Sequence, residues 1–357
     1  MRILRVAQKL YPDVVGGGPY HVHAMSRDQA AMGHDVTVLT VGDGPPREHR
    51  DGYTVVRKPA LAEPLGNAIS PHATWVLNAA SRFDVVHAHS HLYALTNVAA
   101  LGRRLDETPL AITNHGLYSQ TAPRWLFDAY LRTLGRWTFN SADVVFCYTD
   151  TERDQLREFG VRSDIAVVSN GIDTGRFAPD GPKSELIDAA GPVVLFAGRL
   201  VEGKRPLEAI RALETVRARG CDATLYVAGE GPLESELRAA ARERGLSESV
   251  RFLGHVPYDE MPDVYRAADV LVLPSRDEGM PRTVLEALAS GVPVVVSSNL
   301  RQVREAFGES VGYASDAEAF GERIVEALER DVSSAPDGRF SWERTVKETT
   351  AQLAELV

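Results

Sequence analysis

Short apolar runs alternate with longer segments of mixed polarity along the whole chain. Most runs are nearly all apolar and rich in β-branched residues, which is typical of strands buried on both faces of a parallel sheet. The first run is too short and too interrupted for a signal peptide, so we interpret it as a buried strand. The runs predict strands at Ile3–Ala7, Val36–Thr40, Val85–Ala88, Ala111–Thr113, Val144–Cys147, Ala166–Val168, Val193–Ala197, Thr224–Ala228, Val250–Phe252, Val270–Leu273 and Val292–Val296.

Amphipathic helices are predicted between these strands, for example over Pro206–Arg219 and Leu233–Arg244. Gly33 and Gly220 follow two of the helices and are typical stop signals. Repeated strand–helix–strand units predict an α/β protein built on parallel sheets.

The alternation breaks once, between Asn170 and Gly191, where Gly, Pro and Asp dominate the sequence. We place the linker there, which gives Rossmann-like domains over about 1–172 and 173–340. Ligands bind beyond the carboxyl ends of the strands in open parallel sheets. Two such sheets facing each other would form an inter-domain cleft.

Composition agrees with this organisation. The chain has 357 residues, 44% hydrophobic and 25% charged, which fits about two globular domains and excludes disorder as the main state. No stretch reaches the roughly 18 apolar residues of a membrane-spanning helix. Cys147 and Cys221 are too few for a disulfide framework or a four-thiolate metal site, and each lies in an apolar run. We therefore expect buried thiols and a cytoplasmic protein.

The net charge of −10 is unevenly distributed. Residues 1–172 hold 17 basic and 17 acidic side chains, whereas residues 173–357 hold 22 and 32. Such an acidic protein is a poor candidate for general nucleic-acid binding. An anion site would have to be made locally, from a few cations and backbone amides.

Three motifs follow predicted strands. Gly16–Gly18 open a helix that has Val22 and Met25 on its apolar face, and glycines there allow a ligand close to the helix N-terminus. This loop is neither the G-x-G-x-x-G fingerprint nor a P-loop. In the second motif, Arg199 and Lys204 share one strand–helix loop, where they could converge on a phosphate.

The third motif is the stretch from Ser275 to Pro293, after the strand at Val270–Leu273. Glu278 falls in the loop, Pro281 suits the first turn of a helix, and Glu286 lies over a turn into that helix. The free amides of this loop and helix could hold sugar hydroxyls or a phosphate. The alternative is an acidic residue that favours the helix dipole, followed by a solvated glutamate.

The sequence resembles a retaining glycosyltransferase of family 4, which has the GT-B fold. The resemblance covers nearly the whole chain, and its motifs occur in the order of the family. They are Gly16–Gly18, Val168–Asp173, Gly198–Leu200 with Lys204, Gly229–Leu233, Phe252–Val256 and the stretch from Glu278 to Glu286. The segment after Phe340 also resembles the C-terminal helix of the family, so residues 341–357 are expected to pack back onto the first domain.

The resemblance implies a nucleotide-sugar donor site, mainly in the second domain. Arg199 and Lys204 would stabilise the leaving diphosphate in place of a metal ion, so no cofactor is expected. Glu286 would bind the ribose, and Glu278 would contact the donor sugar as an electrostatic and positioning residue. The remaining residues expected around the donor are Gly17, Gly18, His255, Val256, Gly279, Met280, Pro281, Arg282 and Thr283.

The resemblance also implies roles in the first domain. His115 matches the histidine that contacts the sugar, and Asp13 would help to orient the acceptor hydroxyl. Transfer would retain the anomeric configuration by front-face substitution, because no pair of carboxylates suits a glycosidase-type double displacement. Acceptor specificity is expected in the loops around residues 42–72 and 115–125, and the hinge near Asn170–Asp173. The sugar, the base and the acceptor, whether glycan, lipid-linked or small molecule, are not identified.

Two further patterns have competing interpretations. His87, His89 and His91 alternate, so their imidazoles could share one strand face as in a metal site, but no local carboxylate or thiol completes it. Residues 124–139 interleave aromatic and basic side chains. They could lie on a membrane surface as a peripheral contact, or form a core helix with a cationic outer face. Apolar positions on more than one face favour burial.

Three rival functions remain. A nucleotide-sugar epimerase of the same fold would need catalytic carboxylates that we cannot place. An inactive nucleotide-sugar-binding subunit is disfavoured by the intact set of Glu278, Arg199, Lys204 and His115. A dinucleotide oxidoreductase is weaker still, since the glycine fingerprint is missing.

Overall fold

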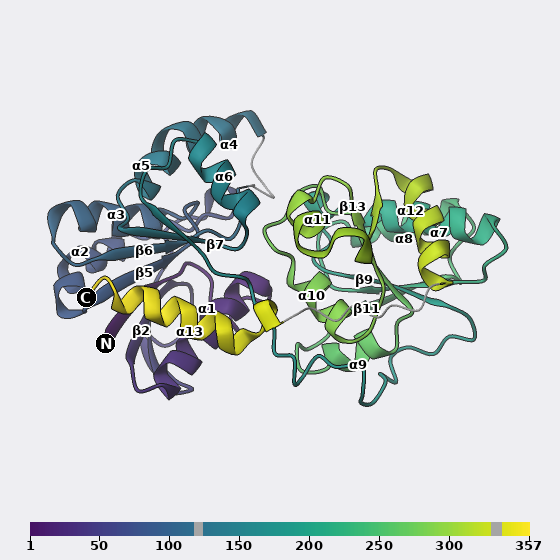
Figure 1. Cartoon of the computed structure of the whole chain (residues 1–357), viewed down its shortest axis with the longest axis horizontal. Coiled ribbons are helices and arrows are strands. Elements are labelled where there is room, and N and C mark those ends of the chain that lie inside the picture. Colours follow the sequence, from purple (N-terminus) through teal and green to yellow (C-terminus); the bar gives the residue numbers. More distant parts are fainter. Residues whose placement is uncertain (118–123, 330–337) are drawn as a thin grey trace. The chain divides into compact units, whose positions relative to one another are not determined.

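The computed structural model describes residues 1–117, 124–329 and 338–357. The chain divides into two compact units. Unit 1 contains Met1–Ser169 and Glu343–Val357, and unit 2 contains Asn170–Trp342 (Figure 1). No helix in these described ranges is long and apolar enough to cross a membrane.

Unit 1 is built on an eight-stranded sheet, counted over the described residues, with the order β3-β4-β2-β1-β5-β6-β7-β8. All neighbours are parallel except β3 and β4. The strands are β1 (Arg2–Val6), β2 (Asp35–Val41), β3 (Arg47–Arg50), β4 (Tyr53–Lys58), β5 (Val85–His89), β6 (Leu110–Thr113), β7 (Val144–Cys147) and β8 (Asp164–Val167).

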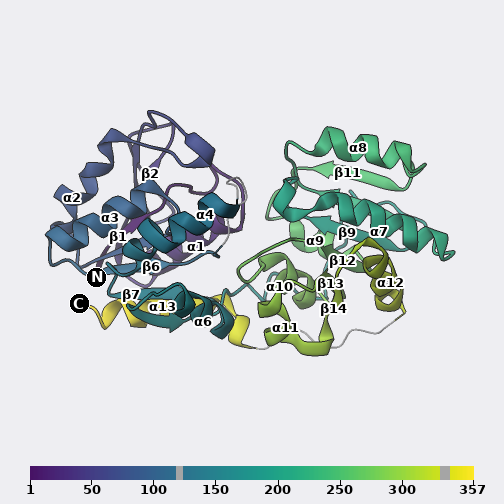
Figure 2. The ribbon, with the colours of Figure 1, turned by 90° about the horizontal axis from the view of Figure 1, so that it is seen from above.

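Both faces of this sheet are covered, which explains why its central strands are almost wholly apolar. Leu4 and Val6 of β1 face a cluster with α3, whereas Ile3 points to the opposite face, against α1 and α13. Figures 1 and 2 show α1 and α13 together on that side of the sheet. The helical segments are α1 (Gly17–Ala31), η1 (Pro64–Gly66), η2 (Pro71–Thr74), α2 (Trp75–Ala79), η3 (Ala80–Arg82), α3 (Ala94–Leu105), α4 (Arg124–Tyr130), η4 (Leu131–Gly135), α5 (Arg136–Phe139), α6 (Asp150–Glu158) and α13 (Trp342–Ala354).

Unit 2 contains a fully parallel sheet with the order β11-β10-β9-β12-β13-β14. Figure 1 shows α7, α8 and α12 on one face and α9 and α10 on the other. Its elements are β9 (Val193–Ala197), η5 (Glu202–Lys204), α7 (Pro206–Ala218), β10 (Thr224–Ala228), α8 (Glu234–Glu243), β11 (Val250–Gly254), α9 (Met261–Arg266), β12 (Val270–Leu273), α10 (Arg282–Ala289), β13 (Val294–Ser297), α11 (Arg301–Phe307), η6 (Gly308–Ser310), β14 (Gly312–Ala314), α12 (Ala317–Leu328) and η7 (Gly338–Phe340).

The predicted α/β class with two parallel-sheet, Rossmann-like domains is confirmed. Four predicted strands, β7, β9, β10 and β12, have the predicted bounds. Three strands were missed. The strand β3 has no apolar residue, β14 has only three residues, and β4 forms an antiparallel pair with β3 inside the expected loop region 42–72. As the edge strand, β3 lacks the buried apolar run that marks a central strand, whereas β4 has buried apolar residues and was missed because it lies in a segment interpreted as loop.

The Gly- and Pro-rich segment after Asn170 is not a loose linker. Ile172 and Phe177 are buried, and Arg266 donates to the backbone oxygens of Ala178 and Pro182. The chain enters unit 2 at Asn170 and leaves it at Trp342, where Ile172 forms a bridge with Ser341. The segment therefore belongs to the packed structure of unit 2.

Candidate active site

Two glycine-containing loops interlock at the carboxyl edge of the unit 2 sheet. The loop after β9 holds Gly198, Arg199 and Leu200, and the loop after β10 holds Gly229 and Gly231. The amide of Leu200 donates to the Glu230 oxygen at 2.8 Å. A Cβ atom at Gly229 would lie 2.0 Å from the Gly198 oxygen, and one at Gly231 would lie 2.4 Å from the Leu200 oxygen. Only glycine allows this close approach.

Lys204 and Glu278 form an ion pair across two neighbouring loops. The Lys204 ammonium lies 2.5 Å from the Glu278 carboxylate, and the two side chains are only 15% and 6% exposed. The Arg276 amide also donates to the Gly203 oxygen at 2.9 Å, which ties the same two loops together. The predicted phosphate-binding and sugar-binding residues are therefore in direct contact. Arg199 is exposed on the same loop as Lys204.

Two amide side chains donate hydrogen bonds to the backbone of the loop that carries Glu278. The Gln302 side chain, on α11, donates to the backbone oxygens of Glu278 and Gly279, both at 2.7 Å. The Asn170 side chain donates to the Met280 oxygen at 3.0 Å. With these carbonyls bound, the loop backbone has a defined orientation before any ligand arrives.

Pro281 is the N-cap residue of α10, one position before the first turn in which it was predicted. Glu286, on the same helix, is buried and accepts hydrogen bonds from Tyr258 at 2.9 Å and Tyr265 at 3.0 Å. The Arg282 guanidinium donates to Tyr258 and to the Gly171 oxygen, both at 2.8 Å. Burial and the adjacent Glu286 carboxylate raise the pKa of Tyr265 well above its ordinary value. Both Glu286 oxygens are engaged, so ribose binding would require Glu286 to accept further bonds or exchange these partners.

Three other predicted donor residues lie around this edge. His255 is exposed, and its amide donates to the Glu230 carboxylate at 3.2 Å, while Val256 is buried. Thr283 lies in the first turn of α10. The Thr283 hydroxyl, like that of buried Ser275 after β12, has no hydrogen-bond partner within the described part of the chain. Such groups are expensive to bury unpaired, and a polar ligand would satisfy them.

In unit 1, His115 lies in a chain of hydrogen-bonded side chains at the carboxyl ends of β5, β6 and β7. Its Nδ1 is 2.7 Å from the Tyr148 hydroxyl, and its Nε2 is 3.0 Å from Nδ1 of His89. The ring centroids of His87 and His89 are 4.5 Å apart, and Nε2 of His87 is hydrogen-bonded to the Thr113 hydroxyl at 2.7 Å. A neutral imidazole has one donor and one acceptor nitrogen, so these partners constrain the tautomer of His115.

Burial keeps these groups uncharged. Desolvation lowers the pKa of His115 to about 4 and holds the pKa values of His87 and His89 well below their ordinary range. Burial raises the pKa of Glu152 to about 7. This carboxyl group accepts the Tyr148 amide at 2.7 Å and so holds the residue that contacts His115.

The alternating histidines form no metal centre. His87 and His89 are part of the chain described above, and the His91 ring packs 4.6 Å from that of Phe139. No group of three or more His, Cys, Asp or Glu side chains within residues 1–117, 124–329 and 338–357 is arranged to hold a metal ion.

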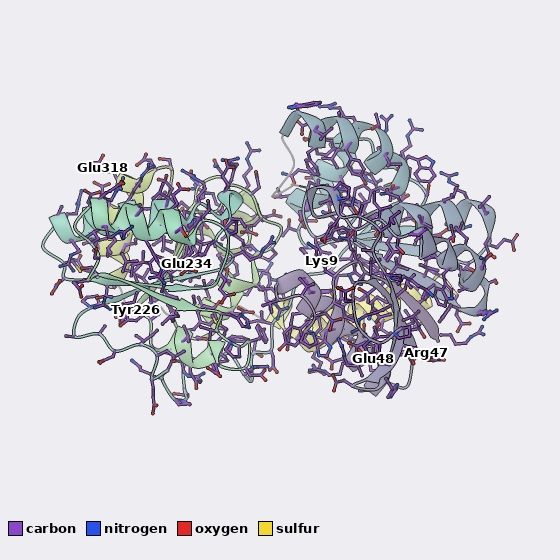
Figure 3. The ribbon with its side chains drawn as sticks, turned by 180° about the vertical axis from the view of Figure 1, so that it is seen from behind. Lys9, Arg47, Glu48, Tyr226, Glu234 and Glu318 are labelled. Atoms are coloured by element: carbon purple, nitrogen blue, oxygen red, sulfur yellow. The ribbon has the colours of Figure 1, made fainter. Side chains whose placement is uncertain are left out.

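Asp13 belongs to an ion-pair cluster with β3 and β4. Its carboxylate lies 2.5 Å from Arg57 and 3.2 Å from Arg50, and Glu48 shares both arginines. Figure 3 shows Glu48 next to Arg47 on the edge strand β3. Asp13 therefore fixes the loop before α1 to this edge. A role toward an acceptor stays a prediction.

Gly18 is glycine for no reason of internal packing. A Cβ atom there would meet nothing within 4 Å. Gly17 and Gly18 form the first turn of α1, and Val22 and Met25 are buried as predicted. This open space leaves room for a ligand beside the first turn of α1.

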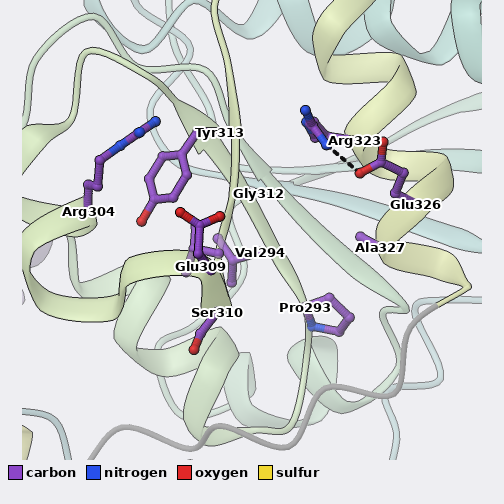
Figure 4. Close-up of a pocket in the computed structure, with 11 residues that line it drawn as sticks. Pro293, Val294, Arg304, Glu309, Ser310, Gly312, Tyr313, Arg323, Glu326 and Ala327 are labelled. Carbon is purple, nitrogen blue, oxygen red and sulfur yellow. Dashed lines mark hydrogen bonds and ion pairs between the residues drawn. The ribbon is translucent and has the colours of Figure 1, made fainter.

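A pocket of about 270 Å³ lies at the opposite edge of the unit 2 sheet, at the amino ends of β13 and β14 (Figure 4). Arg304 covers the Tyr313 ring, with its guanidinium carbon 4.2 Å from the ring centroid, and Arg323 pairs with Glu326. None of the predicted site residues lines this pocket, so it is separate from the candidate active site.

Comparison with known proteins shows which family the chain belongs to. The model of "Glycosyltransferase Family 4" matches residues 15–176, and that of "Glycosyl transferases group 1" matches residues 179–337. A glycogen synthase of Mycobacterium tuberculosis (strain H37Rv) is 30% identical over 369 residues, covering 93% of this chain and 84% of the relative. The chain belongs to glycosyltransferase family 4. It is therefore a glycosyltransferase.

Solved structures show the GT-B fold of this family 4 chain. Sucrose-phosphate synthase from Thermosynechococcus elongatus superposes with a TM-score of 0.79 at 20% identity, covering 100% of this chain and 99% of that structure. Anabaena HepE in complex with UDP-glucose superposes with a TM-score of 0.77 at 19% identity, covering 99% and 98%. At these identities the likeness shows the fold alone.

Sequence reasoning missed several residues that shape the family 4 site. Gln302, Tyr258 and Tyr265 contact the predicted residues directly, yet they lie outside the quoted motifs or carry no charge. In unit 1, Tyr148 holds His115 in the same way, and so does His89, which the sequence suggested only as part of a metal-like pattern. The one available signal was position, since His89 and Tyr148 each lie at the carboxyl end of a strand.

Proposed function

We propose that this glycosyltransferase moves a hexosyl group from a nucleoside diphosphate sugar to an acceptor hydroxyl. The observation that carries the proposal is the Lys204–Glu278 pair at the carboxyl edge of the unit 2 sheet, beside the exposed Arg199. A half-buried cation on the same loop as a second cation suits a diphosphate, and the paired carboxylate suits a sugar hydroxyl. The UDP-glucose bound by HepE makes UDP-sugars the first donors to test.

We propose that the diphosphate is stabilised by side chains in place of a metal ion. Lys204 and Arg199 would face the negative charge that develops on the leaving group. On donor binding, the Lys204 ammonium would be shared between Glu278 and a phosphate oxygen. Glu278 then keeps its charge balanced while it orients the sugar.

Retention is proposed for a related reason. Glu278 is paired with Lys204, and Glu286 is bound by two tyrosines, so neither is placed as the nucleophile or the acid/base of a double displacement. In front-face substitution the anomeric carbon–phosphate oxygen bond breaks, and the bond to the acceptor oxygen forms on the same face. The acceptor proton passes to the departing phosphate oxygen. Asp13, Gly17, Gly18 and His115 keep their predicted roles as part of this proposal.

The first test is calorimetric titration with UDP, GDP, ADP and CMP, with and without EDTA. Tight binding of one diphosphate that EDTA does not change would support the donor site and its independence from metal. Loss of binding in EDTA would overturn the metal-independent mechanism. Absence of binding by all four nucleotides would favour an inactive or partner-dependent protein.

Product analysis separates the remaining alternatives. Nuclear magnetic resonance of the product should show the anomeric configuration of the donor, and inversion would refute the front-face mechanism. Conversion of the donor without an acceptor would instead indicate the epimerase.

Cytoplasmic location is also proposed, since Cys147 and Cys221 are both free thiols.

A further inference from the structure

The helical segment that runs from α4 through η4 to α5 is amphipathic, with an uncovered apolar side. Phe127, Leu131 and Phe139 are buried in unit 1, as the burial interpretation requires. Burial is wrong for four other apolar residues. Trp125 is 73% exposed, and Leu126, Leu134 and Trp137 are 38%, 44% and 36% exposed. We call these four residues, together with Arg132 and Arg136, the α4–α5 face.

Two exposed tryptophans on one short segment are unusual on a protein surface. Large apolar side chains left exposed on one segment often mark an interaction site. The indole ring has an apolar body and one N–H donor, so it suits a boundary between an apolar phase and water.

The charges of the α4–α5 face point to one kind of partner. Arg132 and Arg136 are exposed, whereas Asp128, the acidic residue within Trp125–Phe139, is half-buried. The Arg136 stem packs over Gly160, where a Cβ atom would be 3.1 Å from its Cδ, while the residue as a whole stays exposed. Long cationic side chains with packed stems and solvated heads are typical of interfacial helices.

The distribution of charge over the chain also favours an anionic partner for the α4–α5 face. Residues 173–357 carry the whole net charge of −10, whereas residues 1–172 are neutral overall. An anionic surface would repel unit 2 and attract the arginines of the α4–α5 face. We propose that this face binds the surface of an anionic lipid bilayer, with Trp125 and Trp137 at the level of the headgroups. The proposal does not depend on which sugar is transferred.

Vesicle co-sedimentation of the full chain at low salt tests this proposal. The protein should bind vesicles of phosphatidylcholine and phosphatidylglycerol, bind phosphatidylcholine alone much more weakly, and be released by salt. R132Q/R136Q should lose about 25-fold in partitioning, from about 1 kcal/mol for each arginine. W125S/W137S should lose at least about tenfold. The matched control R242Q/L186S, in unit 2, should bind as the wild type.

Three results would overturn the proposal. They are no sedimentation with either vesicle, wild-type binding by both double variants, or a concentration-dependent dimer that W125S/W137S abolishes. Brominated lipids give a second readout in the unmodified protein, because they should quench tryptophan fluorescence only if the rings enter the bilayer surface. Binding is measured without nucleotide, so its failure is distinguishable from a failure of the donor-site proposal.

Discussion

Gly229 offers the sharpest test of how the fold positions the donor loop. Its φ of +139° is a conformation that residues with a side chain rarely adopt, and a Cβ atom would lie 2.0 Å from the Gly198 oxygen. An ordinary contact begins at 3.4 Å, so Gly229→Ala must push the Gly198 carbonyl away by at least 1.4 Å. That carbonyl belongs to the peptide bond that leads directly into Arg199.

The expected loss has two parts. Backbone strain should destabilise the protein by about 1–3 kcal/mol. Displacement of Arg199 by about 1 Å should lower kcat/KM by about 100-fold. Gly220→Ala is the matched control, because Gly220, at the end of α7, has a φ of +84° but a Cβ atom there would meet nothing within 4 Å. It should show the strain without the functional loss.

Urea unfolding and nucleotide titration of both variants measure these parts separately. A larger loss of stability in G229A than in the control, with a loss of nucleotide affinity only in G229A, would support the reasoning. If G229A binds the nucleotide within twofold of G220A, contact between the two glycine loops does not position Arg199.

Four further results are expected. Glu278→Ala should abolish transfer while nucleotide affinity stays nearly intact, since it removes the sugar contact and leaves Lys204 for the diphosphate; near-normal turnover would sink the assignment. Tyr148→Phe removes the hydroxyl at His115 Nδ1, so kcat should fall with little change in KM, and an unchanged kcat–pH profile would contradict a positioning role. Glu152 has a pKa of about 7 when folded, against 4.5 ordinarily, so the folded state binds an extra proton between these values, and the contribution of this group to stability should fall by up to about 3 kcal/mol as the pH rises from 4.5 to 7. The free energy of unfolding of E152Q should lack that slope. Below about pH 6.5 the net sign reverses, because burial lowers the pKa values of four histidines, His87, His89, His91 and His115, so the unfolded state binds more protons than the one that folded Glu152 retains; unfolding curves that stay flat from pH 6.5 to pH 4.5 would refute this.

The core strands could be predicted because burial on both faces leaves a continuous apolar signature. The strand β9 reads Val-Val-Leu-Phe-Ala and is fully buried, so sequence and structure agree to the residue. The strand β3 reads Arg-Glu-His-Arg and is held by pairing with β4 and by ion pairs, which no local pattern records. Edge elements depend on tertiary partners that single-sequence patterns do not contain.

The candidate site also contains residues that the sequence could identify and contacts that it could not. Lys204 and Glu278 could be identified because charged residues after buried strands stand out, but their direct pairing over 74 positions could not. Gln302 and Tyr265 act through hydrogen bonds to atoms far away in the sequence. Trp125 shows the opposite failure, since its apolar character predicted burial and the described residues leave it 73% exposed.

Unit 1 is discontinuous in sequence, and this sets an order for its maturation on the ribosome. Leu353 of α13 is fully buried against Ile3 and Val36, and Thr350 accepts a hydrogen bond from Gln29 at 2.9 Å. These partners emerge from the ribosome before all of unit 2, whereas α13 emerges after it. Unit 2 is contiguous in sequence and can complete its core before α13 is available to cover one face of the unit 1 sheet. The earliest-synthesised domain is thus the last to be finished, and its open apolar side is where a nascent chain most needs a chaperone.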